Sequence, residues 1–134
     1  MTNDFTATSN DVRVTARAFF LPDRSKPEES QFFWAYRIRV ENLGAAAVQL
    51  LKRTWLITDA IGHTQRVHGD GVIGQTPVIA PGESFEYTSG TPLSTGSGFM
   101  RGLFHMVDPT DGRAFDVTVP PFSLDSPHQS GRVH

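Results

Sequence analysis

Cysteine is absent from this sequence. A chain without cysteine can form no disulfide bond, offers no thiolate to a metal ion and has no thiol nucleophile, an absence that suits a reducing compartment. Long apolar runs are also absent: none approaches the roughly 18 residues of a membrane-spanning helix, and "MTNDFTATSN" lacks the basic and apolar segments of a signal peptide. We therefore expect a cytoplasmic protein that does not insert into membranes.

An excess of charge of either sign is missing too. The 134 residues include 12 lysines and arginines and 14 aspartates and glutamates, and the formal net charge is −2. Because these charges are spread along the chain, no basic patch attracts nucleic acid or an anionic membrane, and we expect no nucleic-acid partner. The length is that of one domain with one core.

Alternating side chains indicate β-strands over much of the chain. In residues 12–20, small or apolar side chains alternate with arginine, threonine and phenylalanine, as in a strand with one buried face. Residues 32–41 repeat this pattern more strongly. The polar segment between them contains Pro22 and Pro27, which cannot continue a strand ladder. We predict an exposed loop there.

A hairpin follows in the middle of the chain. "VQLLKRTWLITDA" is rich in β-branched and aromatic residues, and a turn over residues 59–62 joins it to "HTQRVH". Further on, Pro81 and Gly82 suit the two central positions of a type II turn. This turn leads into a strand in which Phe85 and Tyr87 are expected to point inward.

A last hairpin closes the domain. Residues 99–107 and 113–119 alternate in the same way and are predicted to pair around a turn at residues 108–112. Pro120 and Pro121 are expected to end the final strand.

About seven short strands, with frequent turn signals and no convincing helix, predict an all-β fold. We expect an immunoglobulin-like or fibronectin-III-like sandwich of two antiparallel sheets, although strand count alone does not separate a sandwich from an up-and-down barrel. The domain is predicted over residues 11–124, with a flexible N-terminus at 1–10 and a disordered tail at 125–134. Trp34 and Trp55 are expected in its core.

The segment "HGDGVIGQTP" contains Gly69, Gly71 and Gly74 in the order G-x-G-x-x-G that dinucleotide-binding proteins use. That motif holds a pyrophosphate because a helix starts directly behind it. Here two prolines follow too soon for such a helix, Asp70 would repel a phosphate, and no lysine follows the glycines. We therefore expect the glycines to provide positive φ angles or a close approach of the backbone.

Histidines give no local metal motif. His63 and His68 would point to opposite faces of one strand, and His105 can meet another histidine only through the fold. His128 and His134 fall in the predicted tail. No serine lies in a G-x-S-x-G context. We predict no catalytic residue, no metal site and no cofactor.

The remaining feature is an apolar stretch at residues 72–79, where Val72, Ile73, Val78 and Ile79 stand among glycine and proline. This stretch is either covered by the sandwich or free to contact a partner. A neighbouring strand edge could accept an extended peptide by β-augmentation. Exposed edges are also compatible with a homodimer. The candidate binding surface comprises Gly69, Gly71, Val72, Ile73, Gly74, Gln75, Pro77, Val78 and Ile79.

Several segments resemble the ApaG family of small bacterial proteins. "VQLLKRTWLITDA", "GDGVIGQTP", "PGESFEYTSG" and "AFDVTVPPFSL" carry the resemblance, which runs from about Val12 to Leu124. It implies a fibronectin-III-like sandwich and a shared glycine pattern without an established biochemical role. Lys52 and Thr54 in "LLKRTW" depart from the commoner "LLSRHW", which weakens any metal or ligand role for a histidine at that position.

The resemblance also bears on function. ApaG-like domains in eukaryotic F-box proteins and in a protein that interacts with DNA polymerase delta are expected to bind other proteins, and the bacterial family is associated with cobalt tolerance and magnesium efflux. We therefore expect a non-enzymatic protein–protein interaction domain with an unidentified protein partner and a link to divalent-cation physiology. The alternative is binding of a small molecule, nucleotide or pyrophosphate through the loop Gly69–Gly74.

Overall fold

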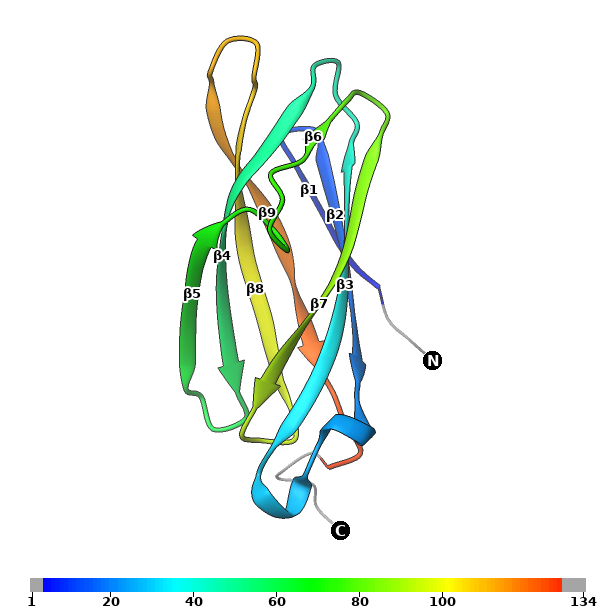
Figure 1. The fold of residues 1–134 in the computed structure, drawn as a ribbon, viewed down its shortest axis with the longest axis vertical. Coiled ribbons are helices and arrows are strands. Elements are labelled where there is room, and N and C mark those ends of the chain that lie inside the picture. The colour runs from blue at the N-terminus through cyan, green and yellow to red at the C-terminus, as the bar shows by residue number, and fades with distance from the viewer. Residues whose placement is uncertain (1–3, 129–134) are drawn as a thin grey trace.

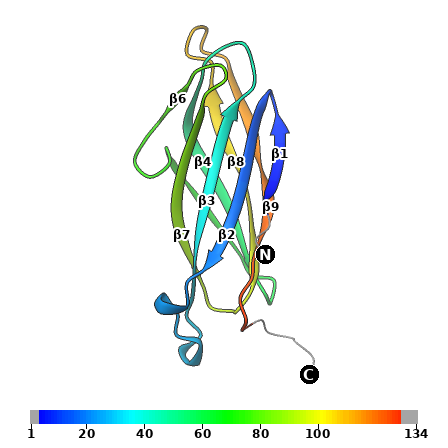
Figure 2. The same cartoon turned by 90° about the vertical axis from the view of Figure 1, so that its right-hand side faces the viewer.

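Two antiparallel β-sheets face each other in the computed structural model, which describes residues 4–128 (Figure 1 and Figure 2). The first sheet has the order β1-β2-β3-β7: β1 (Phe5–Ser9), β2 (Val12–Phe20), β3 (Phe32–Asn42) and β7 (Ser84–Leu93). The second has the order β5-β4-β8-β9, and β6 also pairs with β4: β4 (Val48–Asp59), β5 (Thr64–Asp70), β6 (Val78–Ile79), β8 (Gly98–Val107) and β9 (Ala114–Leu124).

Helical structure in residues 4–128 is confined to two single 3₁₀ turns, η1 (Pro22–Arg24) and η2 (Pro27–Glu29), in the loop between β2 and β3. Each turn starts with a proline, whose fixed φ angle suits the first helical position. No helix in this part of the chain is long and apolar enough to span a bilayer.

The predicted sandwich of two antiparallel sheets is confirmed. The strands predicted at residues 12–20 and 32–41 are β2 and β3, and their inward side chains are buried against the second sheet. Trp34 and Trp55 lie in the core as predicted, and the Trp55 ring makes edge-to-face contacts with Phe104 and Phe122. Removal of this apolar surface from water is the main stabilising contribution.

Strand β1 corrects the prediction of a flexible segment at residues 1–10. Phe5–Ser9 pair with β2, and Asn10 and Asp11 form the two-residue turn between the strands with φ angles of 49° and 61°. Two positive φ angles favour asparagine and aspartate, and such a turn matches the twist of the paired strands. The alternation in "FTATS" followed by "ND" was the available signal. Residues 1–3 lie outside the described residues.

Strand β9 continues past the two prolines that were expected to end it. The pairing of β8 with β9 shifts register between Met100 and Gly102, and Pro120 and Pro121 lie opposite that shift. A bulge on an edge strand tolerates proline because no ladder donor is needed there. The strand therefore reaches Leu124, whose side chain is buried.

The predicted disordered tail also needs correction at its start. The carbonyl oxygen of Asp125 accepts a hydrogen bond from the indole Nε1 of Trp34 at 2.9 Å, and the Ser126 hydroxyl donates to the carbonyl oxygen of Gly96. The His128 ring packs 5.8 Å from that of Phe20. These contacts fix residues 125–128 on the domain. Residues 129–134 lie outside the described residues.

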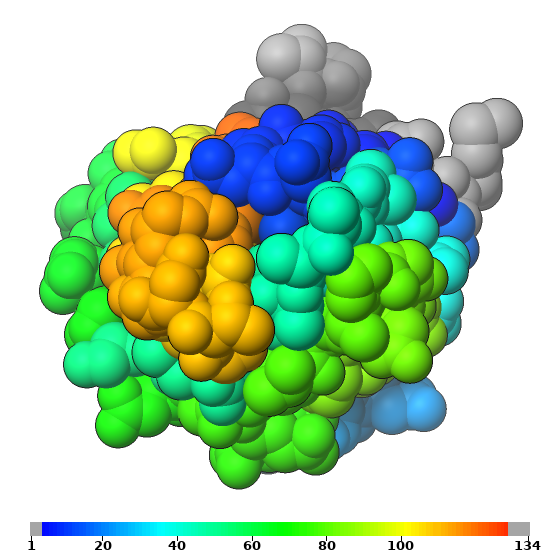
Figure 3. Space-filling view, turned by 90° about the horizontal axis from the view of Figure 1, so that it is seen from above, coloured from blue at the N-terminus to red at the C-terminus, as the bar shows by residue number. Residues whose placement is uncertain are grey.

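The two sides of the sandwich differ. On one side the turn after β1 bridges the sheets: Asn10 Nδ2 donates to the carbonyl oxygen of Asp116, and the Thr118 amide donates to Ser9 Oγ. On the other side the free edges are β7 and β5. Seen from above, the turns between β1 and β2, β3 and β4, and β8 and β9 gather at one end (Figure 3). The open side is where the candidate residues lie.

Candidate functional site

The loop after β5 folds tightly because Gly71 lets two backbone segments meet. Gly71 has a φ of +63°, and a Cβ atom there would lie 2.3 Å from the carbonyl oxygen of Gln75. Only glycine fits such a position. The Gly71 amide donates to the carbonyl oxygen of Leu51 at 2.7 Å, which ties the loop to β4. Gly71 thus provides both the positive φ and the close approach expected from the sequence.

Ile73 and Gly74 form the tip of a two-residue turn. The amides of Val72 and Gln75 each donate to the other residue's carbonyl oxygen, at 2.8 and 2.9 Å, and φ is +44° at Ile73 and +77° at Gly74. These angles define a type I′ turn, which favours asparagine and glycine. A β-branched residue in the left-handed region costs roughly 1–2 kcal/mol. The strained Ile73 is nevertheless 52% exposed, and such strain is concentrated at binding sites.

Ile73→Asn should therefore stabilise the domain. We expect the free energy of unfolding to rise by about 1 kcal/mol, because asparagine suits the first central position of a type I′ turn. Urea denaturation followed by tryptophan fluorescence measures it. Ile61→Asn changes an exposed isoleucine in the turn between β4 and β5, where φ is not positive, and should stay within about 0.5 kcal/mol of wild type. The opposite result would be a loss of stability in Ile73→Asn but not in Ile61→Asn. It would show that contacts of the Ile73 side chain stabilise the domain by more than its backbone strain costs.

The glycine motif does not form an anion cradle of the dinucleotide-binding type. The chain passes from Gly74 to β6 without a helix, and the amides of Gly71, Val72 and Gln75 already donate to carbonyl oxygens. A phosphate site of that type needs free amides at a helix N-terminus. These three amides are therefore not available to a phosphate without opening the loop.

Gly69 serves a different purpose, which is to make room for Arg53. The two residues are opposite each other in the β4–β5 pair, and a Cβ atom on Gly69 would lie 2.6 Å from Arg53 Nη1. Nη1 donates to the carbonyl oxygens of Asp70 at 3.0 Å and Gly71 at 3.3 Å. The guanidinium group is thus held against the backbone of the glycine motif.

A β-bulge turns Arg53 toward the space between the sheets. The register of β4 against β8 shifts between Leu50 and Lys52, so that one extra residue reverses the alternation of the strand. Arg53 then shares the inner face with Trp55 and Ile57, and all three line one cleft. An arginine on the inner face of a sandwich is unusual, because burial of a charge is costly unless the charge is paired.

The Arg53 cleft has a volume of about 380 Å³ and opens between β5 and β7, beside the Ile73 turn. Its wall includes Tyr36, Trp55, Val72, Tyr87 and Met100. The Tyr87 side chain is 5% exposed, and its hydroxyl has no hydrogen-bond partner in the described part of the chain. An unpaired buried hydroxyl costs roughly 1–3 kcal/mol.

Both tyrosine hydroxyls of the cleft have perturbed pKa values. Burial raises the pKa of Tyr87 well above its usual range, the neighbouring Tyr36 adds to the rise, and Arg53 opposes it. Burial also raises the pKa of Tyr36, which a hydrogen bond with Ser89 and the charge of Arg53 partly offset. Like any tyrosine hydroxyl, both are protonated at neutral pH and can donate a hydrogen bond.

The structure divides the candidate surface expected from the sequence. Val72 is 1% exposed and Ile79 is buried, whereas Ile73 and Val78 are 52% and 57% exposed. Ile79 is fixed by its carbonyl oxygen, which accepts a hydrogen bond from the buried Asn42 side chain at 2.9 Å. The other candidate residues belong to the loop between these apolar side chains and the end of β5: Gly69, Gly71, Gly74, Gln75 and Pro77.

The fold also assembles a hydrogen-bonded chain that no sequence motif indicated. Asp116 Oδ1 lies 2.8 Å from His105 Nδ1, His105 Nε2 lies 2.7 Å from Thr54 Oγ1, and that hydroxyl lies 2.8 Å from His68 Nδ1. The rings of His68 and His105 are 5.6 Å apart, so His105 does meet a second histidine through the fold. No three histidine, aspartate or glutamate side chains in residues 4–128 converge as a metal site.

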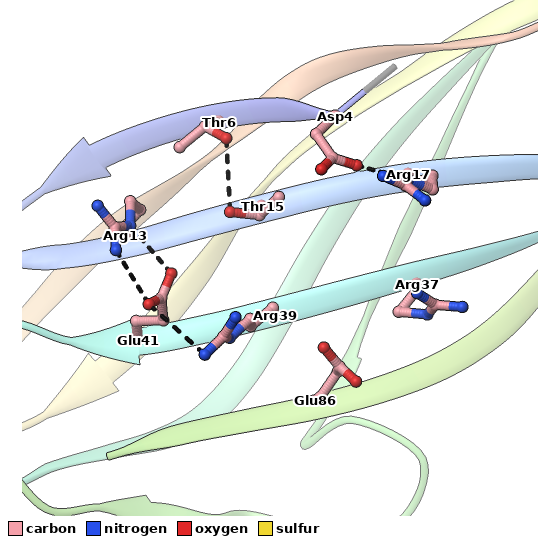
Figure 4. Close-up of a pocket in the computed structure, with 9 residues that line it drawn as sticks. All are labelled: Asp4, Thr6, Arg13, Thr15, Arg17, Arg37, Arg39, Glu41 and Glu86. Atoms are coloured by element: carbon pink, nitrogen blue, oxygen red, sulfur yellow. Dashed lines mark hydrogen bonds and ion pairs between the residues drawn. The ribbon is translucent and has the colours of Figure 1, made fainter. Parts of the chain in front are cut away.

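Arginines cover the outer face of the first sheet, around a shallow pocket of about 460 Å³ (Figure 4). Arg13 binds Glu41 through two hydrogen bonds, at 2.9 and 3.0 Å, and thereby lowers the pKa of that carboxyl. Arg17 pairs with Asp4, and Arg39 lies 3.8 Å from Glu41. Since carboxylates neutralise most of this charge, the pocket is a salt-bridge network rather than a free anion site.

Sequence reasoning did not single out Arg53, Tyr36 or Tyr87 as candidate site residues. The bulge that turns Arg53 inward depends on pairing with β8 and has no mark in the local pattern. The one available signal was the glycine opposite it, because glycine inside a strand often allows another group to approach closely.

Comparisons with known proteins agree with one another. A family model described as "ApaG domain" matches residues 22–108. Protein ApaG of Paramagnetospirillum magneticum is 52% identical over 130 residues, which cover 97% of this chain and 99% of the relative. Protein ApaG of Afipia carboxidovorans is 54% identical over 123 residues, covering 92% and 94%. A crystal structure described as an ApaA protein from Bordetella pertussis matches with a TM-score of 0.84 at 42% identity, covering 89% of this chain and 96% of that chain.

Proposed function

The chain belongs to the ApaG family, and from that premise we propose that it is a cytoplasmic, non-enzymatic domain that binds another protein. The contact would centre on the segment Gly69–Ile79 and the cleft beside it. One observation carries the proposal: Ile73 is held at a strained turn with its apolar side chain in solvent. Selection for stability alone would favour asparagine there, so an isoleucine at this position points to a use at the surface.

The neighbouring strand edges support this choice. β5 and β7 are the free edges of their sheets on the open side of the sandwich, and the Arg53 cleft lies between them. A free edge offers unpaired amides and carbonyls, so an extended segment of a partner can add to the sheet as a further strand. Val78, exposed like Ile73, would extend the apolar contact.

The test compares partners captured by the wild type and by surface variants. Ile73→Asp and Val78→Asp should each lose at least one protein that the wild type retains from lysate of the native cell, whereas Ile61→Asp, at the other end of β5, should retain it. Circular dichroism confirms that the fold is intact. An unchanged set of partners in both folded variants would contradict the proposed surface.

A binding role is favoured over catalysis because of where the reactive groups lie. Thr54, His105 and Asp116 are connected as a nucleophile, a base and an orienting acid would be. They lie on the outer face of the second sheet, away from the Arg53 cleft. None of the three lines either of the two clefts described above.

A role in divalent-cation physiology, including cobalt tolerance or magnesium efflux, stays an alternative, with His68 and His105 as its residues. Cobalt titration followed at the histidine ring resonances distinguishes it. Selective, saturable shifts of both rings at micromolar cobalt would favour the cation role over protein binding.

A further inference from the structure

The charge of Arg53 has no carboxylate partner within residues 4–128. Only Nη1 makes hydrogen bonds to the described protein atoms, and both acceptors are backbone carbonyls of the glycine motif. Nε and Nη2 therefore keep their hydrogen-bonding capacity. A guanidinium group fixed on the inner face of a sandwich, with the three N–H groups of Nε and Nη2 to spare, is prepared for an anion.

The Tyr87 hydroxyl is the second observation that points to a ligand. It is buried in the wall of the same cleft without a partner, and it lies close enough to Arg53 for the guanidinium charge to lower its pKa. A tyrosine hydroxyl is protonated at neutral pH and can donate one hydrogen bond. Together with the guanidinium donors it matches the two oxygens of a carboxylate.

The other residues of the cleft restrict the kind of molecule to which the carboxylate can belong. Trp55, Val72 and Met100 form an apolar part of the wall, which suits an aliphatic or aromatic body. Asp70 also lines the cleft, but its carboxylate lies 3.8 Å from Lys52 Nζ, so Arg53 is the one charged lining residue without an ionic partner among the described residues. A group with a single negative charge fits this balance better than a phosphate.

We propose that the Arg53 cleft binds a carboxylate group on an apolar body. This inference rests on the proposed function, because the free C-terminus of a partner chain that ends in an apolar residue presents that group. With β7 as a free edge, the terminal residues can pair as an extended strand while the carboxylate reaches Arg53 and Tyr87. A free small carboxylate has the same chemistry and is the alternative source.

NMR titration of the whole protein tests the proposal. One probe is a pool of acetylated tetrapeptides, randomised at three positions and ending in Leu, Val or Phe; the other is 3-phenylpropionate. Each acid is compared with its neutral amide: the peptides with the same peptides carrying a C-terminal amide, and 3-phenylpropionate with 3-phenylpropionamide. We expect the acids to shift the Arg53 Nε–Hε signal saturably and the amides to bind at least tenfold more weakly. Equal affinity of acid and amide, or no shift with either acid at millimolar concentration, would overturn the proposal.

Two variants separate a binding role from a structural one. Arg53→Met should abolish acid binding, and Arg66→Met, an exposed arginine of β5, should leave it unchanged. Tyr87→Phe removes only the unpartnered hydroxyl, so we expect acid binding to weaken about tenfold while the Tm rises by roughly 3 °C. Unchanged affinity or a lower Tm in Tyr87→Phe would show that the hydroxyl is structural and would overturn its assignment.

The same variants distinguish this inference from the proposed function. If Ile73→Asp loses a partner that Arg53→Met retains, the proposed protein binding stands. The inference that the Arg53 cleft binds a carboxylate of that partner is then wrong. If both variants lose it and the peptide acids bind more tightly than 3-phenylpropionate, the carboxylate is a chain terminus. Tighter binding of 3-phenylpropionate would assign the site to a free carboxylate and count against the chain-terminus source.

Discussion

Gly71→Ala should lower the free energy of unfolding by about 3 kcal/mol, a loss that most of the other glycine-to-alanine changes in this chain should not reach. Two effects add. A φ of +63° is unfavourable for alanine, and the new Cβ would lie 2.3 Å from the Gln75 carbonyl oxygen, which belongs to the backbone and cannot rotate away. Urea denaturation of both proteins gives the difference directly.

Gly74→Ala is the matched control for this change. Gly74 also has a positive φ, of +77°, but a Cβ atom at this position would have no heavy atom within 4 Å beyond its chain neighbours. Its cost should be only the conformational one, about 1 kcal/mol. Equal losses at Gly71 and Gly74 would show that the chain does not pass as closely to itself at Gln75 as the structure indicates.

Trp34→Ala should cost about 4 kcal/mol, the largest effect that we expect from a single core substitution. Trp34 is fully buried at the end of the core where β3 meets the C-terminal segment, and its ring packs edge-on against Phe20 at 5.4 Å. Its indole also donates to the carbonyl oxygen of Asp125. The substitution therefore opens a cavity and removes the anchor of residues 125–128.

Hydrogen exchange distinguishes these two consequences. In Trp34→Ala, the amide of His128, which donates to Ser126 Oγ at 3.0 Å, should lose protection before the strands do. Phe99→Ala removes an exposed aromatic side chain and should cost less than about 1 kcal/mol, with residues 125–128 unaffected. A loss below about 1.5 kcal/mol in Trp34→Ala would contradict the packing described for this end of the core.

The strands that could be predicted are those whose pattern is written in consecutive residues. The alternation in β3 reflects one face that is buried along the whole strand, and that in β2 reflects a face that is buried over residues 12–16. The Pro81–Gly82 turn follows from the φ preferences of two residues, with Gly82 at +79°. Local chemistry decides these elements, so the sequence alone specifies them.

The elements that could not be predicted depend on distant partners. Residues 125–128 look like a polar tail, and contacts with distant residues fix them: the indole of Trp34, 91 positions away along the chain, the carbonyl oxygen of Gly96 and the ring of Phe20. Pro120 and Pro121 look like a strand end until a bulge against β8 accommodates them. The indole of Trp34 satisfies a carbonyl that local preference would leave in solvent, and the bulge accommodates two residues that cannot donate to a strand ladder.

The candidate site shows the same division. That the glycine motif does not form a phosphate cradle at a helix N-terminus followed from the absence of a helix behind it. That Gly69 leaves room for an arginine, and that the carbonyl oxygens of Asp70 and Gly71 bind it, did not follow, because Arg53 reaches the cleft only through the bulge after Leu50. The apolar residues Val72 and Ile73 are neighbours in sequence, yet one is buried and the other exposed, since the type I′ turn separates their directions.

A double-mutant cycle on Gly69 and Arg53 addresses the link between the glycine motif and the cleft most directly. The three heavy atoms nearest to a Cβ on Gly69 all belong to the Arg53 guanidinium. Gly69→Ala should therefore destabilise the wild type and have little effect in an Arg53→Ala background, with a coupling free energy of about 1–2 kcal/mol. Additive losses, within about 0.3 kcal/mol, would mean that the guanidinium does not rest on Gly69 and that the motif does not position Arg53.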